Sequence, residues 1–251
     1  MSEQMSIEEY LARGGVITAP ENAQPRYRAE ILRIMASFVD SELAGAAGFA
    51  DLINAGPGIK ERITASRIVL EKLDHAERVL KLMEGFGANA SRYMNVHPWT
   101  ARVAREEDLG AERRAGDMRL NVFHYPLLDW EDSVVMNVLM GRATVIQLSE
   151  LAQCSYQPLA ETFGEIVTRE RRHAELGEEG LRQLAARDQG IVSALRNNAE
   201  YWTPRVAASF GSSQSSRYEL LTKFGLRHRR NEDMREEWRQ GVDAVLAEIL
   251  P

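Results

Sequence analysis

PLAETFGEIVTRERRHAELGEEGLRQLAAR, residues 158–187, has apolar residues at helical spacing throughout and predicts one long helix. Glu170 and His173 stand three residues apart, so their side chains lie on the same face of that helix. A carboxylate and an imidazole at this spacing can ligate a metal ion inside a helical bundle. A lone Glu-x-x-His also occurs on solvated, charged helix faces, so residues of the other helices decide between the two interpretations.

The same apolar spacing predicts three more long helices before this one, and shorter helices after it. Gly56-Pro57-Gly58 and Gly85-Phe86-Gly87 end the first two. The irregular residues 88–128 are too many for a tight turn and suit a crossover between two helical hairpins. We therefore predict one all-α domain over 1–251, a ferritin-like four-helix bundle with a long crossover and additional C-terminal helices. The expected core helices are 27–54, 59–84, 130–153 and 158–187, and the expected C-terminal helices lie within 188–249.

Composition excludes several classes of function. The net charge is -6, and basic clusters are interrupted or followed by acids, which argues against nucleic-acid binding. No apolar run approaches the length of a membrane span, and the acidic start MSEQMSIEEY lacks the basic and apolar regions of a signal peptide. The single cysteine, Cys154, allows no internal disulfide. We expect a cytoplasmic protein without a membrane or nucleic-acid partner.

The other helices supply some further ligands, but not a full set. Glu42 lies midway along 27–54, in a stretch of small residues that lets a neighbouring helix approach, and His75 lies in 59–84. Buried charges are rare unless they are paired or bind a metal, so these groups could meet in the bundle core. A second Glu-x-x-His would need a glutamate at position 72, where the chain has Lys72-Leu-Asp-His75.

Several motifs together resemble a known family over roughly residues 25–250. They are SELAG (41–45), LDHAERVLKLMEGFG (73–87), FHYPLLDW (123–130), SYQP (155–158) and YWTP (201–204). The chain resembles the phenylacetic acid catabolism family, in particular the A subunit of ring-1,2-phenylacetyl-CoA epoxidase. The resemblance implies a ferritin-like fold and a di-iron monooxygenase that acts on an aromatic coenzyme A thioester. It also implies electrons from a reductase, and assembly with a homologous, metal-free subunit.

Carried over residue by residue, the resemblance places the ancestral metal site at Glu42, position 72, His75, position 140, Glu170 and His173. Two of these positions depart from the family, because they hold Lys72 and Met140 instead of carboxylates. Glu71 and Asp74 neighbour position 72, but each is rotated by about 100° around the helix, so we expect both to point elsewhere.

These departures predict that the chain is a metal-free, non-catalytic or regulatory and scaffolding subunit. The ammonium of Lys72 would take the metal's place in an internal ion network with Glu42 and Glu170, since a buried cation would repel metal ions. This interpretation predicts no cofactor, and a homologous ferritin-like subunit or a homo-oligomer as partner.

Two alternatives remain open from the sequence. The first is an active iron-dependent monooxygenase with an altered mono- or di-iron site held by Glu42, His75, Glu170 and His173. It would require an acyl-CoA ligand and a reductase. The second is a helical protein that has kept only its ancestry and acquired another role. No residue is assigned as catalytic.

Overall fold

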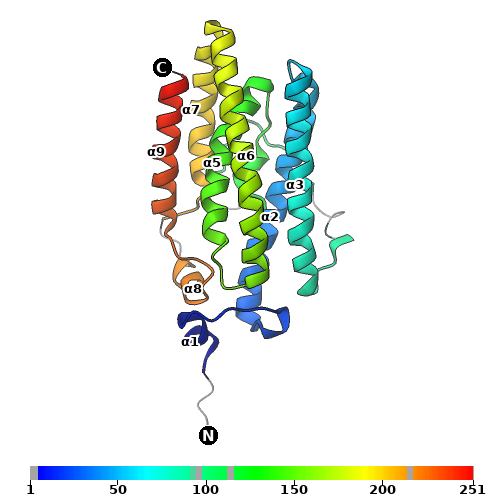
Figure 1. Cartoon of the computed structure of the whole chain (residues 1–251), viewed down its shortest axis with the longest axis vertical. Helices are drawn as coiled ribbons and strands as arrows, with labels where there is room; N and C mark the ends of the chain where they lie inside the picture. The colour runs from blue at the N-terminus through cyan, green and yellow to red at the C-terminus, as the bar shows by residue number, and fades with distance from the viewer. Residues whose placement is uncertain (1–4, 92, 94–97, 112–115, 214–216, 251) are drawn as a thin grey trace.

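The computed structural model describes residues 5–91, 93, 98–111, 116–213 and 217–250. Figure 1 shows two antiparallel helical hairpins side by side, which confirms the all-α, ferritin-like bundle. The predicted core helices agree with the observed ones to within two residues at each end. The observed helices are α2 (Pro25–Leu52), α3 (Ile59–Gly85), α5 (Trp130–Leu151) and α6 (Gln157–Arg187).

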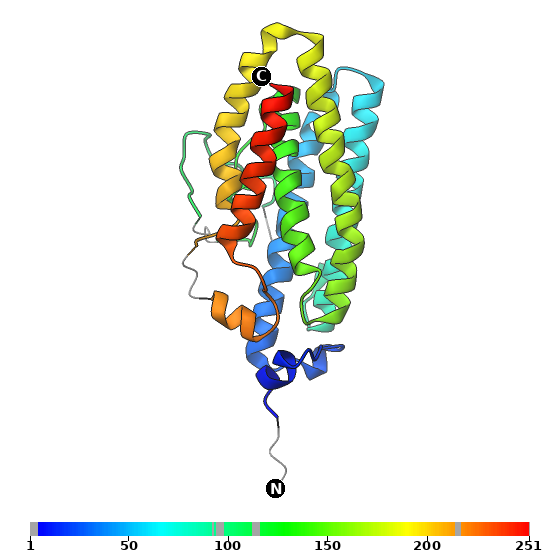
Figure 2. The same cartoon turned by 60° about the vertical axis from the view of Figure 1, so that its left-hand side comes forward.

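The C-terminal helices pack against one side of the bundle. Helices α7 (Val192–Ala208) and α9 (Asn231–Ile249) lie beside α5, and the short α8 (Tyr218–Lys223) lies between them in sequence (Figures 1 and 2). Helix α7 begins only at Val192, because residues Gln189–Ile191 before it form a 3-10 turn. Further 3-10 turns span Pro20–Asn22, Ile53–Ala55 and Asn121–His124. No helix within the described ranges is long and apolar enough to cross a membrane.

One short helix was not predicted from the sequence. Helix α1 (Ile7–Ala12) begins after Ser6, whose hydroxyl accepts from Glu9 N, while the Glu9 side chain accepts from Ser6 N. After α1 the chain reaches Ile17, whose backbone forms hydrogen bonds with those of Ser155 and Gln157 at the bend between α5 and α6. These bonds hold the N-terminal segment against that bend.

Glycines let α5 and α6 approach closely in the middle of the second hairpin. A Cβ at Gly141 would lie 3.1 Å from the Cα of Ala174, and one at Gly177 would lie 2.8 Å from Nδ2 of Asn137. Asn137 donates from Nδ2 to the His173 carbonyl at 3.1 Å. The two helices are thus held close together directly beside the Glu-x-x-His segment.

The apolar core forms two clusters, and a polar layer separates them. One cluster joins α5, α7, α9 and the C-terminal half of α6, and the other joins α1, α2, α3 and the N-terminal half of α6. Along α2, Val39 belongs to one cluster and Ala44 to the other, with Glu42 between them. Each fully buried large apolar side chain contributes about 1.5–3 kcal/mol, so the two clusters can offset the cost of a buried polar layer.

The long crossover docks on α2 at the level of this polar layer. Asp40 is fully buried and accepts hydrogen bonds from the Tyr93 hydroxyl, at 2.7 Å, and from the Met118 amide. The next residue, Ser41, accepts from Leu120 N at 3.0 Å. These contacts hold the crossover against the helix that carries Glu42.

We expect Cys154 to be unreactive in the folded protein. It is 4% exposed in the bend between α5 and α6, and burial raises the pKa of its thiol to about 11. At pH 8 the nucleophilic thiolate is therefore scarce, whereas unfolding returns the pKa to its ordinary value. Ellman's reagent should titrate no thiol in the native protein and one per chain in guanidinium chloride. Rapid native labelling would show that the bend opens in solution.

Candidate functional site

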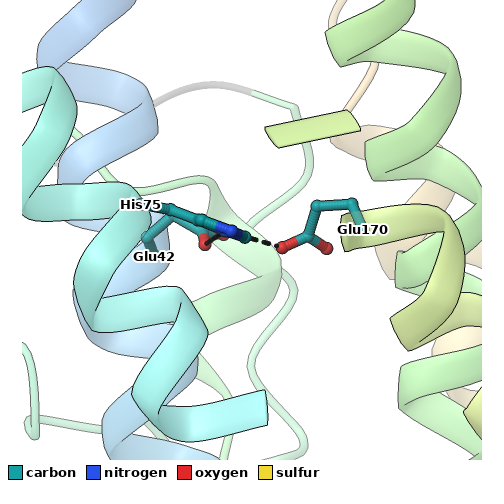
Figure 3. A group of neighbouring side chains, drawn as sticks. All are labelled: Glu42, His75 and Glu170. Atoms are coloured by element: carbon teal, nitrogen blue, oxygen red, sulfur yellow. Dashed lines mark hydrogen bonds and ion pairs between the residues drawn. The ribbon is translucent and has the colours of Figure 1, made fainter. Parts of the chain in front are cut away.

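Three bundle helices bring charged and imidazole side chains together in the buried polar layer. Figure 3 shows Glu42 and His75, from α2 and α3, facing Glu170 across the bundle from α6. Lys72 joins His75 from α3, one turn away, and His173 joins Glu170 from α6. None of the five is more than 6% exposed. The fourth bundle helix, α5, contributes no charge at this level, because its predicted ligand position is Met140.

Lys72 lies between the two carboxylates. Its Nζ is 3.1 Å from Glu42 Oε1 and 3.2 Å from Glu170 Oε1. Burial disfavours the charged amine, but Glu170 and Glu42 outweigh it and raise the pKa of Lys72. Burial likewise opposes ionisation of Glu170, but Lys72 and the neighbouring histidines hold the pKa of that carboxyl well below its usual range. Lys72 and Glu170 therefore form a buried ion pair at neutral pH.

His75 completes the contacts around the two carboxylates. Its Nδ1 is 3.2 Å from Glu42 Oε2 and 3.2 Å from Glu170 Oε1. Burial opposes a charge on the ring, but the hydrogen bonds to Glu170 and Glu42 outweigh it and raise the pKa of His75. Its Nε2 has no hydrogen-bond partner among the described residues. The ring stacks on His173, with centroids 6.0 Å apart.

Glu71 reaches this layer, contrary to the sequence-based expectation. Its Oε2 lies 2.6 Å from His173 Nε2, while its side chain is 28% exposed at the edge of the cluster. The rotation argument was wrong for Glu71 because it places the Cβ atom, and a glutamate can carry its carboxylate around the helix surface. It was correct for Asp74, which points to the exterior and pairs with Arg169 at 2.8 Å.

A cavity of about 450 Å³ approaches the cluster from the side of α2 and α5. Glu42 and Met140 line it together with apolar residues such as Phe38 and Phe123, and Arg33 and Arg227 also contribute to its wall. Two other arginines contact groups of their own, since Arg142 pairs with Glu178 at 2.6 Å and Arg205 stacks on Tyr201. Arg227 donates only to the Met234 sulfur, at 3.8 Å, among the described residues, so of these three arginines it is the one that could meet a ligand in the cavity.

The donor atoms do not fit a dinuclear metal centre. One ligand atom each from Glu42, His75 and Glu170 lie within 4.8 Å of one another, which could suit a single ion. However, the Lys72 ammonium already bonds both carboxylates, and it would have to lose its proton or withdraw to make room. Met140 offers only a thioether, which is a poor ligand for hard cations. The arrangement suits an ion network better than two metal ions.

Comparison with known proteins finds one family model and two relatives that are similar to this chain. A family model described as "Phenylacetic acid catabolic protein" matches residues 1–250. The A subunit of 1,2-phenylacetyl-CoA epoxidase from Escherichia coli (strain K12) is 21% identical over 206 residues, which cover 81% of this chain and 62% of that protein. Benzoyl-CoA oxygenase component B from Aromatoleum evansii is 25% identical over 174 residues, which cover 67% of this chain and 34% of that protein. The chain thus spans less than two thirds of the length of either relative.

Proposed function

Because this chain belongs to the phenylacetic acid catabolic protein family, we propose that it serves aromatic-acid catabolism as a metal-free, non-catalytic subunit of an oxygenase. The observation that carries this proposal is the Lys72 ammonium, 3.1 and 3.2 Å from the carboxylates of Glu42 and Glu170. A cation built into the chain supplies the positive charge that metal ions would otherwise bring to these carboxylates. The bundle keeps its polar core but loses the means to activate oxygen.

A chain of this kind works through its partners. The relatives are named as the A subunit of one oxygenase and component B of another, so each belongs to a multicomponent system. We propose a scaffolding or regulatory role beside a homologous ferritin-like chain in the cytoplasm. The cavity lined by Arg227 and Met140 is the place where such a protein would hold an aromatic acyl-CoA. Its apolar walls suit an aromatic acyl group, and its arginines suit phosphate or carboxylate.

One observation favours a second function. The convergence of ligand atoms from Glu42, His75 and Glu170 could hold one iron ion, with two carboxylates and one imidazole as donors. The chain would then be part of an iron-dependent monooxygenase that acts on an aromatic acyl-CoA, with a reductase as electron source. Lys72 would first have to leave the space between the two carboxylates.

The iron content of the full chain separates these functions. We expect no stoichiometric iron by elemental analysis after expression in iron-supplemented medium and anaerobic loading with Fe²⁺. The reason is that an incoming ion would have to displace an ammonium held by two carboxylates. One iron per chain would instead support the mononuclear alternative, and two would contradict the proposal.

A further inference from the structure

The outer face of α3 carries a stripe of exposed apolar side chains. Ile59, Ile63, Leu70 and Leu73 are 78%, 54%, 67% and 44% exposed. At 100° per residue these four lie within about 80° of one another, on the face opposite to Lys72 and the bundle core. Figures 1 and 2 both show α3 at the edge of the bundle, with no helix covering its outer side. We call this set the α3 stripe.

The α3 stripe is symmetric about Ser66. Ile59 and Leu73 lie seven residues before and after it, and Ile63 and Leu70 lie three before and four after it. Two copies of α3 running antiparallel about a two-fold axis at Ser66 would therefore place Ile59 opposite Leu73, and Ile63 opposite Leu70. An isologous interface requires such a self-complementary pattern. Ser66 is small and exposed, so the two helices could approach closely at the axis.

The charges beside the stripe follow the same symmetry. In a two-fold antiparallel pair, each flank of one helix adjoins the same flank of the other. Lys60 and Asp74 lie on one flank, six residues before and eight after Ser66, so each Lys60 would meet the opposite Asp74. Lys60 makes no ion pair in the described part of its own chain, and Asp74 is 43% exposed beside Arg169. The two Arg67 side chains lie near the axis on this flank, and their repulsion would keep the contact weak.

We propose that α3 pairs antiparallel with α3 of a second copy of this chain, about a two-fold axis beside Ser66. The stripe spans 15 residues, or about 21 Å of helix, which is short for a permanent interface. We therefore expect a reversible homodimer with a dissociation constant on the order of 10 µM. The proposal is independent of the metal-free function, because it rests on the opposite face of α3.

Sedimentation velocity over a concentration series tests the proposal directly. The wild-type chain should shift from a 28.3 kDa monomer to a species of twice that mass as concentration rises. Leu70→Glu places a carboxylate in the stripe of both copies and should raise the dissociation constant by at least about tenfold. Lys60→Glu should weaken the dimer, and adding Asp74→Lys in the same chain should restore it. The matched control is Leu128→Glu, since Leu128 is 61% exposed but lies outside α3.

Cross-linking tests the position of the axis. In Ser66→Cys the two introduced thiols meet at the axis, so a short bismaleimide should give a covalent dimer, while buried Cys154 stays silent. In the control Glu77→Cys the thiol lies on the same face, but about 33 Å from its symmetry mate at 1.5 Å per residue, and should not cross-link. A monomer at every concentration would overturn the proposal. So would a dimer that Leu70→Glu leaves intact, or equal cross-linking of both cysteine variants.

Discussion

Lys72→Met is expected to lower the free energy of unfolding by about 3–5 kcal/mol, because it leaves buried carboxylates without their counter-charge. Glu42 and Glu170 are 4% and 1% exposed, so water cannot take over the role of the ammonium. Methionine nearly matches the volume of lysine, so the loss reports charge rather than a cavity. In a chain of this size the melting temperature should fall by about 10 °C.

The matched control is Lys81→Met in the same helix. The Lys81 side chain is 64% exposed and, within the described ranges, forms an ion pair only with Glu77, one turn away, so its removal should change stability by less than about 0.5 kcal/mol. A double-mutant cycle with Glu170→Gln identifies the partner. The combined loss should be clearly smaller than the sum of the two single losses, since each change relieves the charge that the other leaves uncompensated. A melt of Lys72→Met like that of the wild type would mean that no buried ion network stabilises the bundle.

The sequence predicted the structure accurately where apolar spacing defines a helix and where glycine or proline ends it. The four long helices were predicted within two residues, because Gly56-Pro57-Gly58 and the Gly85 region end helices for local reasons. The six-residue α1 was not predicted, because so short a helix shows no apolar periodicity. Its sequence signal is the capping box formed by Ser6 and Glu9.

The polar layer could be foreseen only in part. Its helices follow from apolar spacing and its positions from the resemblance, and helical spacing places Lys72 on the same face as His75. The contact of Glu71 with His173 could not be foreseen, because helical rotation locates a Cβ and not the end of a long side chain. The cavity beside Met140 was also not predicted, because residues within 209–212 and 217–231 line it from a distant part of the sequence. Contacts that depend on tertiary packing of irregular segments leave little trace in local patterns.

The double variant Lys72→Glu with Met140→Asp is expected to bind two iron ions per chain, whereas we expect no bound iron in the wild type. The two changes remove one positive charge and add two negative ones, so the net charge of the layer becomes more negative by about three units and attracts cations. They also restore carboxylates at both departing positions, beside Glu42, Glu170 and the two histidines. Elemental analysis after anaerobic loading with Fe²⁺ measures the stoichiometry directly.

The single variants serve as controls for this gain of binding. Met140→Asp alone should stay free of iron, because the Lys72 ammonium would pair with the new carboxylate as it pairs with Glu42. Lys72→Glu alone should take up at most one iron, since α5 still presents a thioether. The double variant could fold, as circular dichroism would show, and yet bind no iron. In that case the two restored carboxylates are not enough, and further residues must change before this layer can bind a metal. The contact between Glu71 and His173 would then be the next to remove, because it fixes the His173 ring through Nε2 at 2.6 Å, with Nδ1 on the side of Glu170 at 3.3 Å.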